Sequence, residues 1–395
     1  MTGRLVTCLL ASAALPAVAA AQPAERAAAV SVSGVVYHDR NENGRRDAGE
    51  PGLAGVAVTD QVAVVRTDAE GRFAFPAAGY GYVAVTPPSE FAARRGWYRP
   101  AGTEPIEVPL VARPTTGNFT FIHASDTHIS PATVDRIRRL RTLVDSLQPA
   151  FVILSGDLVR DALRVPEAEA RGYYDLLVAE LARFSVPVFT VPGNHENFGI
   201  ERHRSLVSPD HPLYGKKMYR AYFGPNFYSF DWGGIHFVGL DTVDYFDISY
   251  YGHVDAVQLA WLDADLAAAA DRPVVTFNHI PLLTGALTID GYDDESVAPT
   301  LFKVAGKTAF RHTVRNADSV LSRIGSRLEI ALGGHLHRFE FIRYQTAHGF
   351  RRFALAPAIV GPPRGAGELG IRSGLTLYRV TDRRVDDGTF IPLEP

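Results

Sequence analysis

Carboxylate, amide and imidazole side chains gather in five short clusters, and each cluster directly follows a short apolar run. Runs of about four to eight residues that are rich in β-branched and aromatic side chains are typical of buried strands. Open α/β sheets bind ligands at the carboxyl ends of their strands, so we expect the clusters to converge on one site. The clusters are Asp126-Thr127-His128, Gly156-Asp157, Gly193-Asn194-His195-Glu196, His279 and Gly334-His335-Leu336-His337.

The converging side chains form a ligand set of oxygen and imidazole without sulfur. Asp126 and His128 are two residues apart, so on a strand they would project to the same face, and His335 repeats this spacing with His337. Such a set suits divalent Mn, Fe or Zn. It is too large for one tetrahedral zinc but has the right size for two ions that share a carboxylate. The predicted metal ligands are Asp126, His128, Asp157, Asn194, His279, His335 and His337.

Two such ions can clamp the attacking and leaving oxygens of an in-line phosphoryl displacement and can generate hydroxide near neutral pH. A lone histidine is weak evidence, because most histidines belong to the core or the surface. We therefore interpret His123, His236 and His253, which lie beside predicted core elements, as structural. The ordered set is more specific, since every cluster follows a strand.

This ordered set resembles the calcineurin-like metallophosphoesterase superfamily over about residues 118–385. The resemblance implies a four-layer α/β/β/α sandwich with a dinuclear site bridged by Asp157. It also implies that His195 contacts the substrate and protonates the leaving oxygen, a role that requires an imidazole free of metal. Either Glu196 or Asp161 would orient His195. The implied ligands are Asp126, His128, Asp157 and His337 for one ion, and Asp157, Asn194, His279 and His335 for the other.

Two positions depart from particular branches of this superfamily. Members with a tyrosinate–iron site carry tyrosine three residues after the aspartate of the Gly-Asp pair, where this chain has Arg160. We therefore do not expect a purple ferric enzyme. Protein phosphatases of the superfamily carry an aspartate there, followed by Arg-Gly, whereas Asp161 comes one residue later without that sequence. This difference counts against close kinship with the protein phosphatases.

Alternating strand and helix patterns predict an α/β catalytic domain over residues 118–395. Apolar residues at helical spacing indicate helices near 134–147, 173–184 and 259–266. A hairpin is expected over 227–240 and a late strand over 375–380. We expect two packed sheets with helices on their outer faces, preceded by a small all-β sandwich domain.

The sandwich is predicted over residues 30–112, with strands near 30–37, 55–58, 63–67, 72–75 and 81–85 and a linker over 105–118. It contains the twelve-residue pattern D-x-[DN]-x-[DN]-G-x5-E, which suits Ca²⁺. Its strand-like flanks exclude a helix–loop–helix sensor, and an Asx-rich turn that binds nothing is the alternative. Residues 50–58 and 67–75 resemble calcium-binding B-type and prealbumin-like modules of bacterial surface proteins. The predicted calcium residues are Asp39, Asn41, Asn43, Arg45, Asp47 and Glu50.

The composition and the amino-terminal residues limit the possible number of domains, partners and cellular location. The chain has 395 residues, enough for two or three domains, and its net charge of −3 gives no general attraction to nucleic acid duplexes or anionic membranes. Arg4 and the apolar run that follows it predict a cleaved signal peptide over residues 1–21 and a periplasmic or secreted bacterial protein. The single cysteine, Cys8, lies inside that peptide, so the mature chain would lack disulfides and thiolate ligands. No later segment is long and apolar enough to cross a membrane.

Substrate choice is expected to depend on two insertions, over residues 197–225 and 282–316. The first is basic and forms either a cap that binds an anionic group or an ordinary solvated loop. The second carries an acidic run at 290–295 that is more typical of a solvated turn. The candidate substrate-binding residues are Arg202, Lys216, Lys217 and Arg364.

Three functional classes compete. The favoured class is an exported dinuclear phosphoesterase that hydrolyses small or lipid phosphodiesters or phosphomonoesters, with a metal-bridging hydroxide as nucleophile and His195 as general acid. A metalloprotease fails, because H-E-x-x-H requires histidine where Gly199 stands. The third class is a catalytically inactive, calcium-dependent binding or surface protein on the same scaffold.

Overall fold

The computed structural model describes residues 30–94, 96–114, 117–286, 299–346, 349–361 and 372–394. The expected signal peptide, the acidic run at 290–295 and Arg364 lie outside the described residues. Within them, no helix has the length and apolar character needed to cross a membrane.

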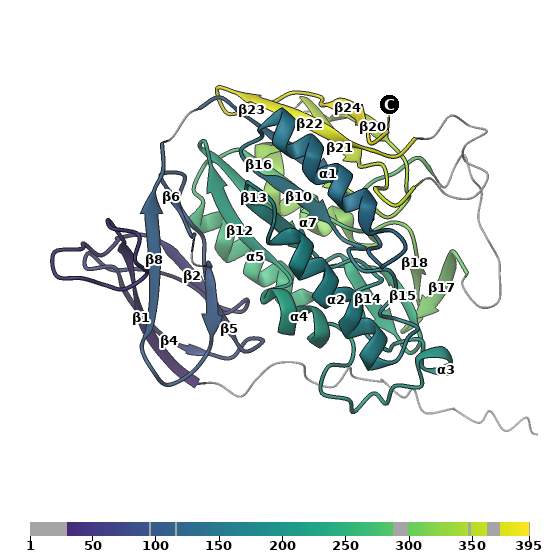
Figure 1. Cartoon of the computed structure of the whole chain (residues 1–395), viewed down its shortest axis with the longest axis horizontal. Coiled ribbons are helices and arrows are strands. Elements are labelled where there is room, and N and C mark those ends of the chain that lie inside the picture. The colour runs from purple at the N-terminus through teal and green to yellow at the C-terminus, as the bar shows by residue number, and fades with distance from the viewer. Residues whose placement is uncertain are drawn as a thin grey trace, which may run out of the picture.

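The amino-terminal domain is a sandwich of two four-stranded sheets, with strand orders β4-β1-β8-β6 and β3-β2-β5-β7 (Figure 1). Alternate residues of the strands point inward, and Val36, Val58 and Val108 are buried between the sheets. The predicted sandwich is therefore present. Its strands are β1 (Val30–His38), β2 (Ala57–Thr59), β3 (Val64–Arg66), β4 (Arg72–Ala77), β5 (Tyr82–Val85), β6 (Phe91–Ala92), β7 (Tyr98–Pro100) and β8 (Ile106–Ala112).

The predicted linker over residues 105–118 was wrong in its first half. Ile106–Ala112 forms β8, which pairs in parallel with β1 and in antiparallel with β6. The linker was inferred from the segment Pro114-Thr-Thr-Gly117, whereas β8 ends before it and places Pro109 opposite Tyr37 in this ladder. The partner strand lies some seventy residues earlier in the sequence, and local composition does not reveal such a pairing.

The domain that follows the sandwich contains two six-stranded sheets. The first has the order β11-β10-β9-β22-β23, with β24 paired to β22, and the second has the order β12-β13-β16-β19-β21-β20. The first sheet consists of β9 (Phe119–Ala124), β10 (Val152–Ser155), β11 (Val188–Val191), β22 (Gly374–Thr381), β23 (Arg384–Val385) and β24 (Thr389–Pro392). The second consists of β12 (Tyr228–Trp232), β13 (Ile235–Leu240), β16 (Val274–Asn278), β19 (Leu328–Gly333), β20 (Glu340–Thr346) and β21 (Gly349–Leu355).

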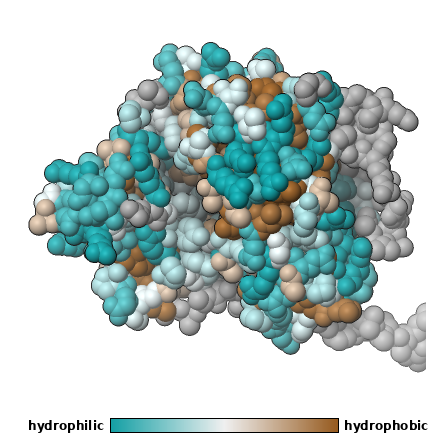
Figure 2. Space-filling view, viewed as in Figure 1, coloured by the Kyte–Doolittle hydropathy of each residue, from teal (hydrophilic) through white to brown (hydrophobic). Residues whose placement is uncertain are grey.

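Helices cover the outer face of each sheet, as the four-layer prediction requires (Figure 1). Aromatic side chains fill the space between the sheets. In the middle layer Phe121 stacks on Phe151, and both meet the edge of Phe237. Hydrophilic residues dominate the outer surface of the helical layer (Figure 2). The helices are α1 (Val134–Leu147) and α2 (Glu167–Leu181) over the first sheet, α5 (Ala256–Ala268) and α7 (Ala317–Ile324) over the second, and the short α3 (Arg202–Ser205) and α4 (Lys217–Phe223) in the basic insertion.

The two domains meet through a buried polar and aromatic interface. Gln61 Nε2 donates to the carbonyl of Phe227 at 2.9 Å, and Trp97 packs on Tyr228 with ring centroids 4.3 Å apart. The guanidinium of Arg220, from the basic insertion, lies 4.1 Å above the ring of Tyr80. The insertion therefore contributes to the contact between the domains.

Candidate dinuclear metal centre

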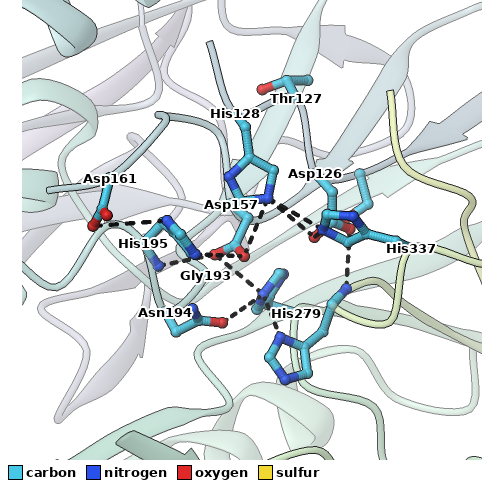
Figure 3. A network of polar contacts seen from close by, with 12 residues as sticks. Asp126, Thr127, His128, Asp157, Asp161, Gly193, Asn194, His195, His279 and His337 are labelled. Atoms are coloured by element: carbon cyan, nitrogen blue, oxygen red, sulfur yellow. Dashed lines mark hydrogen bonds and ion pairs between the residues drawn. The ribbon is translucent and has the colours of Figure 1, made fainter. Parts of the chain in front are cut away.

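Five strands of the two sheets, each parallel to a neighbour within its sheet, end directly before the five predicted clusters. The strands β9, β10 and β11 of the first sheet and β16 and β19 of the second all point their carboxyl ends to one place. The structure thereby brings the polar side chains of the clusters together, although they come from segments more than two hundred residues apart (Figure 3).

The backbone of the clusters is left-handed at most of the predicted ligands, whereas the sequence suggested extended strand. Asp126, His128, Asp157, His335 and His337 have φ values of +54°, +38°, +48°, +76° and +53°. Each therefore lies in non-extended backbone just past its strand, and the two-residue spacing does not place the pair on one strand face. Positive φ is costly for residues other than glycine and tends to accumulate at functional sites.

Asp126, His128 and His337 form the first group of converging ligands. Their ligand atoms lie within 4.8 Å of one another. Nε2 of His128 and Nε2 of His337 face each other at 3.2 Å, and His337 Nε2 lies 3.2 Å from Asp126 Oδ1. That Oδ1 atom is buried and accepts no hydrogen bond from the described residues. Two facing ring nitrogens and a bare carboxylate oxygen fit a bound cation.

Asp157, His279 and His335 form the second group, and Asn194 joins them. His279 Nε2 lies 3.2 Å from Asp157 Oδ1, 3.2 Å from His335 Nδ1 and 3.1 Å from Asn194 Oδ1. The other oxygen of Asp157 lies 3.6 Å from His128 Nε2 in the first group. Asp157 therefore stands between the two groups, where a bridging carboxylate would stand (Figure 3).

The charges of this cluster keep its carboxylates ionised and two of its imidazoles neutral, whereas two other imidazoles gain a proton more readily. Burial opposes this gain, but Asp157 raises the pKa of His279 to about 9 and Asp126 raises that of His337. Burial opposes ionisation of Asp126 and Asp157, but the neighbouring imidazoles outweigh it and hold the pKa of both carboxyls below their ordinary range. Burial and the adjacent His195 lower the pKa of His128 to about 4, so this imidazole stays neutral. The pKa of His335 is also lowered, chiefly by burial. Neutral imidazoles and ionised carboxylates are the forms that coordinate cations.

His195 lies beside both groups with one ring nitrogen tied to the backbone. Its Nδ1 donates to the carbonyl oxygen of Arg160 at 2.6 Å, and its Nε2 lies 3.8 Å from Asp157 Oδ2. The same carbonyl lies 3.3 Å from His128 Nδ1, so one backbone oxygen orients both rings. The sequence distinguishes Arg160 only by its side chain, and nothing in it indicates this function of the carbonyl.

The two acids that were expected to orient His195 have different partners. Asp161 Oδ1 lies 3.9 Å from His195 Nδ1, within ion-pair distance (Figure 3). Glu196 is buried and faces the backbone instead. Its Oε1 accepts the N–H groups of Leu158 and Val159 at 2.8 and 2.9 Å, and its Oε2 accepts that of Gly193 at 2.6 Å. Glu196 thus joins the loops that carry Asp157 and Asn194.

Glycine is required where these loops touch. A Cβ atom on Gly193 would lie 2.2 Å from both N and Oδ1 of Asp157, and one on Gly156 would lie 2.6 Å from His279 Nδ1. Gly156 also has φ of +90°. The glycines of the Gly-Asp and Gly-Asn-His motifs therefore let the ligand loops pack against each other.

The histidines that we interpreted as structural lie in hydrogen-bonded positions. His123 is buried with Nε2 2.8 Å from Ser155 Oγ. His236 is buried between Asp231 and Asp265, and His253 lies 2.9 Å from Asp244.

The candidate substrate cations of the basic insertion lie in contacts with other parts of the chain. Arg202 forms an ion pair with Asp247 and Lys216 forms one with the buried Asp241 at 2.7 Å. Lys217 is the first residue of α4. The structure therefore uses Arg202 and Lys216 to hold the insertion in place and does not bring them into the ligand cluster.

The predicted calcium loop lies at the outer end of the amino-terminal domain, left in Figure 1. Asp39 is buried and its carboxylate accepts the N–H groups of Asn43 and Gly44 at 3.2 and 2.8 Å. Glu50 accepts those of Arg40 and Asp47 at 2.8 and 3.0 Å. The loop is thus wound around its own acidic side chains.

Comparisons with known proteins agree with this geometry. The calcineurin-like phosphoesterase family matches residues 119–339. Human acid phosphatase type 7 is 26% identical over 277 residues, which cover 64% of this chain and 55% of that protein. A probable cyclic nucleotide phosphodiesterase from Rhodococcus erythropolis is 26% identical over 229 residues, or 55% of this chain and 64% of that protein. The chain therefore spans less than two thirds of the length of these relatives.

Among solved structures, a dimetal phosphatase from Danio rerio matches with a TM-score of 0.45 and 16% identity over 70% of this chain and 99% of that one. A purple acid phosphatase from yellow lupin (Lupinus luteus) seeds has a TM-score of 0.44 and 13% identity over 93% of this chain and 69% of that one. The match to the family spans more than half of the sequence and contains all five clusters. The chain belongs to the calcineurin-like phosphoesterase family.

Proposed function

We propose that this protein is a dinuclear metal-dependent phosphoesterase that hydrolyses phosphodiesters or phosphomonoesters. The observation that carries the proposal is the position of Asp157 between two groups of imidazole and carboxylate ligands, with His195 Nε2 3.8 Å from Asp157 Oδ2. Two bound divalent ions would supply a nucleophile from water near neutral pH and would neutralise charge on the phosphoryl oxygens.

The residues of the chain have separate roles in this proposal. Asp126, His128 and His337 would hold one ion, and Asn194, His279 and His335 the other, with Asp157 shared. His195 holds its Nδ1 hydrogen on the carbonyl of Arg160, so Nε2 is the atom that would donate a proton to the leaving oxygen. A general acid of this kind contributes roughly 10²–10⁴-fold in rate.

The first experiment measures hydrolysis of a chromogenic phosphodiester and of the matching monoester after removal and return of Mn²⁺. Activity on either ester that depends on Mn²⁺ supports the proposal. A diester preference would agree with the name of the Rhodococcus relative, and a monoester preference with that of the human one. Two bound ions without activity on either ester would favour the alternative, an inactive binding protein on this scaffold.

Two substitutions separate the roles of the site. Asp157→Asn should lose ions and activity together, because both groups of ligands use this carboxylate. His195→Ala should keep both ions and lose about 10²–10⁴-fold in rate. Loss of ions from His195→Ala, measured by elemental analysis, would contradict the assignment of His195 as the acid.

We further propose that the amino-terminal domain binds Ca²⁺ at residues 39–50 as a structural ion. Support comes from the loop pattern and from the carboxylates of Asp39 and Glu50 at its centre. Millimolar Ca²⁺ should raise the melting temperature over that in a chelator, and Glu50→Gln should remove most of this rise. An equal rise with Mg²⁺, or none with Ca²⁺, would contradict a calcium site.

Export to the periplasm or the medium remains part of the proposal and is supported by the composition of residues 1–21. Expression in a bacterial host with fractionation and amino-terminal sequencing would test it. A protein that stays in the cytoplasm with residues 1–21 attached would refute export.

A further inference from the structure

A histidine outside the five clusters makes direct contact with one of the metal ligands. His312 Nδ1 lies 2.8 Å from His335 Nε2, and the two rings are tilted by 34° with centroids 4.9 Å apart. His312 belongs to the insertion that follows His279, just after the hairpin of β17 (Leu301–Val304) and β18 (Lys307–Phe310). The five sequence clusters do not include it.

The hydrogen bond fixes the tautomers of both rings. His335 turns its Nδ1 toward the second ligand group, 3.2 Å from His279 Nε2. A ring nitrogen that binds a cation must present its lone pair, so with an ion bound at Nδ1 the hydrogen of His335 would reside on Nε2. Nε2 would then donate to Nδ1 of His312, and His312 would carry its own hydrogen on Nε2. The chain thereby supplies the acceptor that keeps His335 in its metal-binding form.

The backbone around His312 is held on both sides. Arg311 N donates to the carbonyl of Thr300 at 2.9 Å, and Val314 N donates to that of Pro281 at 2.9 Å. Arg315 N donates to the carbonyl of Gly252, the last residue of β15 (Ser249–Gly252), at 3.0 Å. Figure 1 shows β17 and β18 beside β14 (Val243–Phe246) and β15. The segment 311–315 is thus fixed between β15 and the residues after His279.

Close approach at this point depends on glycine. A Cβ atom on Gly252 would lie 2.2 Å from the carbonyl oxygen of Thr313, the neighbour of His312. Tyr250, two residues before Gly252, places its ring 5.9 Å from that of His335 in an edge arrangement. The guanidinium of Arg311 lies 4.4 Å above the same tyrosine ring. One side chain of β15, Tyr250, and one of the segment 311–315, His312, therefore contact His335.

We propose that His312 is a positioning residue for the metal ligand His335, and that the segment 311–315 supports the metal site. The inference rests on the proposed function, because it assigns His335 to an ion. A hydrogen bond to the distal nitrogen of a ligating histidine fixes ring orientation and raises ligand basicity. Loss of such a partner typically lowers metal affinity by roughly 10–100-fold.

The test compares metal binding by His312→Leu and His312→Asn in the full chain. Leucine removes the acceptor, whereas Oδ1 of asparagine can accept a hydrogen bond near the position of Nδ1. Calorimetric titration of metal-free protein with Mn²⁺ should show one of two sites weakened by roughly 10–100-fold in His312→Leu. His312→Asn should retain most of the affinity, and the ligand-field spectrum of the Co²⁺-loaded protein should change at one site only in the leucine variant.

A matched control is His253→Leu. His253 is part-buried in the same region, where it binds Asp244 at 2.9 Å and stacks on Tyr251. This variant should bind both ions as the wild type does. If His312→Leu does not fold, His312→Ala takes its place, with circular dichroism as the check.

The outcomes distinguish this inference from the function on which it rests. Wild-type affinity at both sites of a folded His312→Leu protein would overturn the inference and leave the proposed function intact. Equal weakening in the leucine and asparagine variants would also overturn it, since the acceptor would then be irrelevant. A wild-type protein that binds no divalent ion would refute the proposed function itself.

Discussion

Glu196 gives the sharpest prediction about how the ligand loops are held. Its carboxylate accepts three backbone N–H groups, two at Oε1 and one at Oε2, and its exposed fraction is 1%. Glu196→Gln keeps size and shape but offers only one carbonyl oxygen. If that oxygen takes the Oε1 position, the amide NH₂ group faces the N–H of Gly193, and two donors meet in a buried place.

The cost follows from this geometry. One charge-assisted hydrogen bond is lost, which is worth about 1.5–3 kcal/mol, and a buried N–H is left without an acceptor. Relief of repulsion from the nearby Asp157 offsets part of this loss, since burial and Asp157 together raise the pKa of Glu196 to about 8. We expect a net loss of about 1–3 kcal/mol, which lowers the Tm by roughly 2–12 °C in a domain of 150–250 residues.

The assay is thermal unfolding of the metal-free protein at pH 8.5, where the carboxylate of Glu196 is mostly ionised. Asp271→Asn, the same chemical change at an exposed position, is the control and should leave the Tm unchanged. A Glu196→Gln protein as stable as this control would refute the reasoning that Glu196 holds the two loops together.

Three further predictions concern other parts of the molecule. Burial would lower the pKa of His236, but Asp265 and Asp231 outweigh burial and raise this pKa to about 9. The protonated ring therefore stabilises the fold by at most about 3 kcal/mol, fully below pH 6.5 and less and less as the pH rises through 9. Unfolding of wild type and His236→Gln from pH 6 to 10 should show this loss of stability in the wild type alone. Gly193→Ala should weaken metal binding at least tenfold, because its Cβ atom would clash with Asp157. The control Gly172→Ala, in the middle of α2 with open space around it, should bind metal as the wild type does, and equal ion affinities of the two variants would contradict the clash. Gln61→Ala removes buried hydrogen bonds to Asn226 and Phe227, so limited proteolysis between the domains should become faster, and an unchanged rate would show that these bonds do not hold the interface.

The convergence of the predicted ligands could be foreseen from the sequence, because their chemistry is concentrated in short motifs at strand ends. Asp126 and His128 follow β9 directly, and His335 and His337 follow β19. Hydrophobic runs identify such strands, and the sheet then determines where their ends lie. The turn geometry was not predictable, because positive φ at Asp126 and His128 results from contacts with other loops.

The groups that hold the ligand loops in place could not be predicted from short sequence motifs. Three of the groups that hold the ligand loops are backbone N–H groups bound to Glu196, and a fourth is the carbonyl of Arg160. Every residue type except proline offers an N–H and every residue a carbonyl, so composition cannot distinguish these positions. His312 is similar, since its partner His335 lies 23 residues later and the fold alone brings them together.

The basic insertion shows why a run of charge is a poor guide to function. Lys216 and Arg202 suggested a surface that binds anions, yet each contacts an aspartate from a later hairpin or loop. Lys216 forms an ion pair with Asp241. Burial raises the pKa of Asp241, and the ion pair with Lys216 offsets only part of this rise. A lysine that pairs with a buried carboxylate has a structural role, because its removal would leave the charge of the carboxylate unpaired.

Asp241 also takes part in hydrogen bonds that connect the amino-terminal domain with the region of the site. Asp241 Oδ2 also accepts the amide of Asn226 at 2.6 Å, and Asn226 Oδ1 accepts Gln61 Nε2 of the sandwich at 3.3 Å. Asp241 is followed by Thr242, whose Oγ1 donates to the carbonyl of Ile280, directly after the ligand His279. Buried hydrogen bonds and one backbone step therefore connect the domain interface to Ile280, the residue after the predicted ligand His279. Because unpaired polar groups in such a network are costly, we expect a change at Gln61 to affect this connection as well as the contact between the domains.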